Sequence, residues 1–282
     1  MASVISTEQL RRAIAGGVIG FFNDSAKGQE PIVPSDHALC PKGGVAWRVH
    51  ADVAGMMVGG AAALLWQMLH PKALAGVWDH SDFRKNMHGR LRNTARFIAV
   101  TTYGARDQAE AAIARVRKIH DHVNGTLPDG TPYDANDPRL LAFVHVAGSA
   151  MFLAGYRRFV EPGMPRADRD TYWQEVAVIG GLLGADPLPR SEREADALAR
   201  EYLLELRADE RSRTVRDIIL NAPPERLRLL PLQKLVMRSA VDLLPSEVRR
   251  LHGLHSSGLA SPGVAAATFG LASTLRWALR PA

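Results

Sequence analysis

The stretch from residue 53 to residue 69 constrains the fold most, because its 17 residues carry no charge. Glycine and alanine supply many of them, and Gln67 is a polar residue close to its end. A helix that is apolar on all sides must lie inside a protein or in a membrane. This stretch is at the lower length limit for crossing a bilayer, and its small side chains are typical of close helix packing. We therefore expect a buried helix and no integral membrane span.

The rest of the chain also favours helices. Ala, Leu and Arg are abundant, aromatic residues make up only 6%, and no alternating strand pattern of convincing length occurs. The sequence predicts an all-α protein with a single globular domain over residues 1–282. Helices are expected at residues 8–22, 47–69, 71–77, 89–103, 105–123, 138–160, 168–183, 191–208, 213–221, 230–244, 246–251 and 263–280.

The charge of the chain excludes few function classes. The net charge of +6 is spread along the sequence instead of being gathered in one tail. Such a charge argues for solubility, and the sequence has no zinc-finger, RNP-like or bZIP pattern. We therefore expect no nucleic-acid partner.

Cysteine content and targeting signals bear on the compartment. The single cysteine, Cys40, excludes an internal disulfide and a multi-cysteine metal cluster. The pair Arg11-Arg12 before an apolar stretch imitates a signal peptide, but acidic Glu8 precedes it and no small-residue cleavage site follows. These features predict an ordinary first helix and a cytoplasmic protein.

The predicted helix at 105–123 carries a histidine inside its apolar stripe. At 100° per residue, His120 falls between Val116 and Ile113, whereas His122 points to the polar side. A histidine that faces the core is either a hydrogen-bonded structural residue or a ligand. The pattern alone favours the structural interpretation, since histidine is often partly buried. The stripe consists of Ala109, Ala112, Ile113, Val116, Ile119 and Val123.

The predicted helix at 89–103 places Arg90 and Thr94 on the same face as Leu91 and Phe97. A guanidinium that points inward must meet an anion, because an unpaired buried charge is costly. The structural interpretation is a buried salt bridge or a position at the rim. The functional interpretation is an arginine beside a bound anionic group, such as a propionate, a superoxide-like oxygen or a substrate acid. Thr94 offers a hydroxyl to the same group.

His145 lies in a helix that is apolar on nearly every side, so we expect it to be buried. It is a candidate second ligand, a hydrogen-bond partner of a ligand, or a core histidine that donates to a backbone carbonyl. The last two together are favoured. We expect Arg90, Thr94, His120 and His145 to converge around one internal cavity.

Taken together, these pieces resemble the family of the mpaB oxygenases and the rubber-cleaving latex-clearing proteins. The resemblance covers about residues 44–185, and more loosely the rest, which consists of an N-terminal helix and irregular connection at 1–43 and C-terminal helices at 186–282. The matching stretches are residues 47–52, 59–60, 63–67, 70–71, 77–81, 90–94, 103–104, 116–120, 123–125, 133–138, 140–145 and 172–173.

The resemblance implies a b-type haem whose iron is held by one histidine. His120, in an Arg-x-x-His pattern, matches that ligand, and Arg90 and Thr94 match an Arg-x-x-x-Thr pair near the distal haem face. Rubber-cleaving members have a lysine directly before the threonine as a possible axial ligand. Asn93 stands there in this chain and is a weak ligand, so we expect five-coordinate or water-bound iron.

Two glycines and His145 complete the expected cofactor contacts. Gly59 and Gly60 would let backbone approach a flat macrocycle closely, although close helix packing explains them equally well.

The resemblance further implies a haem b-dependent oxidase or oxygenase that uses dioxygen on a small apolar substrate, unsaturated or aromatic. Cleavage of a carbon–carbon double bond is the best-known reaction of the family, and hydroxylation, oxidation or peroxidase-like chemistry is also compatible. One alternative is a non-catalytic haem- or lipid-binding helical protein. Another is a structural helical protein that has lost the cofactor. The sequence specifies neither the substrate, nor the electron source, nor the oligomeric state.

Overall fold

The computed structural model describes residues 31–222, 230–258 and 261–279, together with residues 8, 9, 11, 12 and 16. Within these residues the fold consists of 12 α-helices, one short 3-10 helix and two strands of three residues each. The prediction of an all-α protein is confirmed. Of the helix expected at 8–22, the five described residues are all helical, and the other positions lie outside the described residues.

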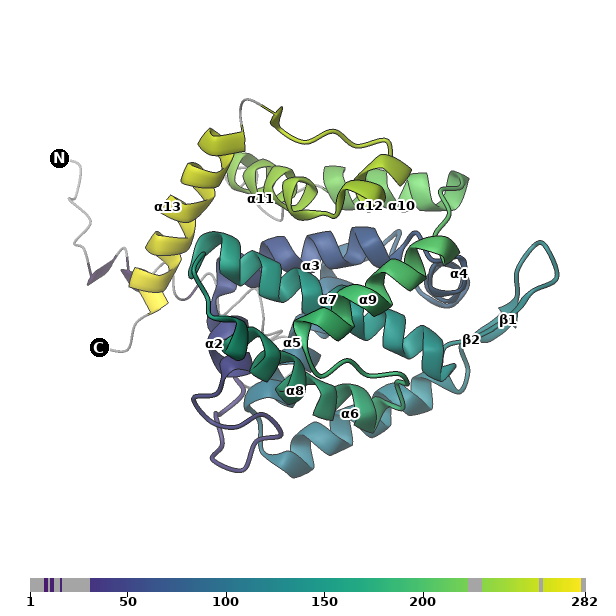
Figure 1. Ribbon diagram of the computed structural model, residues 1–282, viewed down its shortest axis with the longest axis horizontal. Helices are drawn as coiled ribbons and strands as arrows, with labels where there is room; N and C mark the ends of the chain where they lie inside the picture. The colour runs from purple at the N-terminus through teal and green to yellow at the C-terminus, as the bar shows by residue number, and fades with distance from the viewer. Residues whose placement is uncertain are drawn as a thin grey trace.

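Two long helices, α3 (Val53–Gln67) and α7 (Pro138–Phe159), pack along each other in the middle of the molecule (Figure 1). Small residues let their backbones approach. A Cβ atom on Gly59 would lie 2.5 Å from the backbone oxygen of Met151, and one on Gly155 would lie 2.6 Å from the oxygen of Gly55. The expected burial of the charge-free stretch is confirmed, since most of α3 is buried.

The prediction of a single helix at 47–69 is wrong, because the chain turns by 88° at Asp52. The turn separates α2 (Val45–Ala51) from α3. Asp52 is the N-cap of α3, accepting a hydrogen bond from the backbone N–H of Gly55 at 2.7 Å. Its other oxygen accepts from Arg276 at 2.8 Å, so one buried carboxylate both starts α3 and fixes a C-terminal helix to it.

The remaining helices surround this pair. Helix α5 packs on α6 and α2, and α8 packs on α2, α6 and α7. Helices α10, α11 and α12 lie above α3 and α7 in the view of Figure 1, while α11 and α13 contact α3 directly. The bounds are α4 (Pro71–His80), α5 (Met87–Tyr103), α6 (Arg106–His120), α8 (Arg166–Leu183), α9 (Glu192–Tyr202), η2 (Leu203–Glu205), α10 (Glu210–Asn221), α11 (Leu230–Leu243), α12 (Ser246–Leu251) and α13 (Ser261–Leu279).

The turn-rich connection between α6 and α7 contains a small hairpin that the sequence pattern did not predict. Strand β1 (Asn124–Thr126) pairs antiparallel with β2 (Pro132–Asp134) and protrudes from the helical body in Figure 1. Its turn uses Gly130, whose φ of 87° suits glycine. The N–H of Ala135 then donates to the oxygen of Val123 at 2.9 Å, which brings the chain back to the end of α6.

Among the described residues, one helix is long and apolar enough to cross a membrane. It is α7, and 61% of its most apolar window is buried inside the protein. The pair of α2 and α3 meets the same test only when it is counted as one span despite its bend. Burial of this kind is what the core helix of a globular protein shows.

Candidate functional site

His120 is the last residue of α6, and this helix follows the predicted stripe only in part. Ala109 and Ile113 are buried, and His120 is half-buried. The prediction that Ile119 belongs to the apolar stripe is wrong. Its side chain lies in the last turn of α6 and is 56% exposed to solvent. His122 is exposed, as its position on the polar side predicted.

The two ring nitrogens of His120 have different surroundings. Nδ1 is buried and has no hydrogen-bond partner, whereas Nε2 is not among the buried atoms and has no partner within the described part of the chain. Burial lowers the pKa of His120, and the charge of Arg90 lowers it further, against the opposite effects of Asp134, Asn136 and Asp121. The ring is therefore neutral at neutral pH, which is the form that binds metal.

Arg90, in the first half of α5, is half-buried and makes no ion pair among the residues that the structure describes. Burial lowers the pKa of its guanidinium, and Asp82 only partly offsets this effect. The buried salt bridge, one of the two structural interpretations, is therefore not formed within the described chain. The half-buried position of Arg90 agrees with the other one, a place at the rim, and an anionic group from outside the protein as its partner stays a prediction.

Thr94 and Asn93 are exposed residues of α5. The Thr94 hydroxyl donates to the backbone oxygen of Arg90 at 3.1 Å, a common use of threonine inside a helix. It does not contact the Arg90 guanidinium, so any shared ligand would have to draw this hydroxyl away from the backbone.

The inner face of α5 is loosely covered. Only Met87, Thr101 and Thr102 are buried among its 17 residues, while Leu91 and Phe97 are half-buried beside the core. Helix α5 packs mainly on α6 and α2, and Leu91, Phe97 and Arg90 each keep part of their surface uncovered.

His145 faces a different neighbour from His120. A Cβ atom on Gly180 of α8 would lie 3.1 Å from His145 Nδ1, and the ring meets Trp173 edge-on at 6.5 Å. The residue as a whole is half-buried, but Nε2 is buried without a partner, and burial lowers the pKa of His145 to about 4. Helices α5 and α6 pack on each other, and the charge of Arg90 lies near enough to His120 to lower the pKa of its ring. No interaction within the described residues joins His145 to either of them.

Most of the chain matches a known protein family. Residues 47–277 match the family described as ER-bound oxygenase mpaB/B'/Rubber oxygenase, catalytic domain. The chain belongs to this family. The match confirms the resemblance seen in the sequence, and it includes the C-terminal helices as far as residue 277 in α13. No curated protein and no solved structure matches the chain.

The two glycines of this oxygenase domain that were expected to face a cofactor differ from each other. Gly59 is pressed against the backbone of Met151, so helix packing accounts for it. A Cβ atom on Gly60 would meet only the ring of Phe152, at an ordinary 3.7 Å. A cofactor contact at either glycine stays a prediction, and Gly60 has the room for one.

Sequence reasoning missed a buried polar network next to α5. His50 Nδ1 lies 2.8 Å from the Thr102 hydroxyl, and its Nε2 lies 3.2 Å from the Tyr172 hydroxyl, which donates to the oxygen of Ser149 at 3.2 Å. Every polar atom of the His50 ring has a partner, and burial lowers the pKa of His50 to about 4. The network ties α2, α5, α7 and α8 together as a structural element. Its members are far apart in the sequence, so no local spacing could reveal it.

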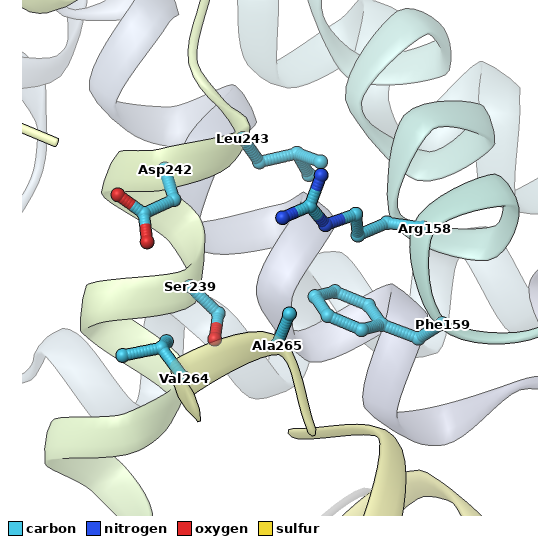
Figure 2. A pocket seen from close by; sticks show the side chains of 7 residues that line it. All are labelled: Arg158, Phe159, Ser239, Asp242, Leu243, Val264 and Ala265. Carbon is cyan, nitrogen blue, oxygen red and sulfur yellow. The ribbon is translucent and has the colours of Figure 1, made fainter. Parts of the chain in front are cut away.

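A pocket of about 220 Å³ opens between α7, α11 and α13 (Figure 2). Arg158 and Asp242 enter it from different helices, as Figure 2 shows. Its lining contains none of the predicted site residues, and it is smaller than the usual range for ligand sites of roughly 300–1,000 Å³. We therefore do not assign the oxygenase chemistry to this pocket. Its lining is Arg158, Phe159, Ser239, Asp242, Leu243, Val264 and Ala265.

Proposed function

We propose that this oxygenase domain binds haem b through His120 and uses dioxygen to oxidise a small apolar substrate, unsaturated or aromatic. The observation that carries the proposal is the asymmetry of the His120 ring, whose Nδ1 is buried while Nε2 is open. A neutral imidazole with one enclosed and one open nitrogen suits a metal ligand.

The donor set of the chain fits a haem better than a bare metal ion. No group of three or more His, Cys, Asp or Glu side chains that could hold a metal ion occurs among the described residues. A haem iron brings four nitrogen ligands of its own and needs only an axial ligand from the protein. His120 can supply that ligand alone.

The chain's own residues then have distinct tasks. A bound haem would supply the activation of dioxygen. Arg90 holds a positive charge at the half-buried end of α5, where it can bind a haem propionate, a substrate acid or another anionic group. The half-buried side chains of Leu91 and Phe97 offer an apolar surface beside it, which suits an apolar substrate. Thr94 and Asn93 place polar groups on the same helix.

The main alternative is a haem- or lipid-binding protein without turnover. Uptake of dioxygen by the haem-loaded protein, in the presence of candidate alkenes, separates the two. A cytoplasmic location is also part of the proposal, supported by the incomplete signal-like pattern around Arg11-Arg12. Recovery of the native protein mainly from membranes or the medium would contradict it.

Arg90→Ala tests whether Arg90 takes part in the reaction. We expect the variant to keep its haem absorbance and to lose dioxygen consumption by about a hundredfold, the size of effect seen when a charge-stabilising donor is removed. Arg115→Ala removes an exposed arginine of α6 and is the matched control, with activity near that of the parent protein. Unchanged dioxygen consumption in Arg90→Ala would show that Arg90 has no part in turnover.

A further inference from the structure

We propose that Asn136 positions His120, accepting a hydrogen bond from its Nδ1–H so that the lone pair stands on Nε2. The use of Nε2 as the iron ligand rests on the proposed function, whereas the hydrogen bond itself does not. Asn136 would be a positioning residue that acts through His120.

Asn136 lies in the connection between β2 and α7, held against the last turn of α6. Its side-chain Nδ2 donates to Asp121 Oδ1 at 2.8 Å and to the backbone oxygen of Arg117 at 3.4 Å. Its backbone N–H donates to Asp134 Oδ1 at 2.7 Å. Arg117 and Asp121 flank His120 in the sequence, so these bonds fix the amide beside the histidine. They also define its orientation, since only the NH₂ end can donate to both oxygens.

The other end of the amide has no partner in this arrangement. Asn136 Oδ1 is buried and makes no hydrogen bond, and His120 Nδ1 is also buried and makes none. Buried polar groups without partners are rare because each costs free energy. One group is an acceptor and the other becomes a donor in the Nδ1–H tautomer, so a hydrogen bond between them would satisfy both. The Asn136 side chain also raises the pKa of His120, which places the amide next to the imidazole ring.

The consequence is a ring set for ligation before any cofactor arrives. Histidine in water prefers the Nε2–H tautomer, which has no lone pair on Nε2. Metal-binding histidines nearly always donate their second N–H to a carbonyl, a carboxylate or water, and this fixes both the tautomer and the ring orientation. Asp121 and Asp134 both accept from Asn136, and neither makes a hydrogen bond to the described His120 ring. We assign the amide oxygen, which is buried and has no other partner, as the acceptor for His120.

The test is the tautomer of His120 in the full-length protein prepared without haem, read from ¹⁵N chemical shifts of its labelled histidine rings above neutral pH. We expect protonated Nδ1 and unprotonated Nε2 in the parent protein. Asn136→Ala should shift His120 towards the Nε2–H form. Asn221→Ala, which removes an exposed asparagine at the end of α10, should leave the signals unchanged.

A Nε2–H ring in the parent protein overturns the proposal whatever the variant does, and so does an unchanged Nδ1–H ring in folded Asn136→Ala. A second readout is haem affinity, which should fall about tenfold or more in Asn136→Ala, as is typical when the partner of a ligand is removed. Failure of the proposed function is distinguishable, because it would appear as full haem retention by His120→Ala while the tautomer of the parent ring stays Nδ1–H.

Discussion

His120→Ala should leave a folded helical protein that no longer retains haem. The nearest other histidine in the sequence, His122, is exposed. The ring of His145 meets Gly180 of α8 through Nδ1, and its Nε2 is buried, so we expect neither histidine to replace the lost ligand. We expect the haem affinity to fall by more than the roughly 100-fold that is lost when only a ligand's partner is removed. Haem content after gel filtration measures the effect, and far-ultraviolet circular dichroism checks the fold.

The same variant should also lose the stabilisation that haem confers. A ligand that binds only the folded state raises the unfolding temperature by mass action, so haem should raise it in the parent protein and hardly at all in His120→Ala. His122→Ala is the control and should behave like the parent. Full haem occupancy in His120→Ala together with loss in His145→Ala would assign the iron to His145 instead.

Gly59→Ala should destabilise the protein by about 3 kcal/mol, near the upper end of what overpacking of a core costs. The added methyl group would lie 2.5 Å from the Met151 oxygen, and a backbone atom in a long buried helix cannot move aside easily. The two central helices would have to separate, which would loosen the core on which α5, α6 and α8 are placed.

Gly60→Ala is the matched control for this substitution. Its methyl group would meet only the Phe152 ring at 3.7 Å, and alanine favours helix over glycine by roughly 0.5–1 kcal/mol. Urea unfolding of both variants measures the difference, and we expect Gly60→Ala to be at least as stable as the parent protein. Equal stability of Gly59→Ala and Gly60→Ala would contradict the close crossing of α3 and α7.

Much of the helical architecture could be predicted from the sequence, because the periodicity of apolar residues marks where helices begin and end. Helix α12 has the predicted bounds, and α7 and α11 end within one residue of them. The bend at Asp52 was missed because the apolar pattern continues across it. Only the side chain of Asp52, a typical N-cap, marked the new helix start. The hairpin was missed because strands of three residues are too short for an alternating pattern.

The phase of a single helix predicted some positions of the candidate site and not others, since Ile119 and Thr94 were expected to face inward and are exposed. The half-buried positions of His120 and Arg90 follow from the spacing within α6 and α5. The nearness of Asn136 to His120 does not, because the β1–β2 hairpin intervenes and tertiary contacts of a loop bring the two together. The direction of His145 towards α8 likewise depends on how α7 and α8 pack on each other. The apolar pattern of a single helix cannot predict such packing.

The haem content of the purified parent protein tests directly whether this domain binds haem through His120. The chain is produced with a supply of haem precursor, its absorption spectrum is recorded, and haem is quantified against protein. We expect a Soret band and a single haem for each chain, with the band lost in His120→Ala. A folded parent protein that shows no Soret band, even after incubation with excess haemin and removal of the unbound fraction, would contradict it.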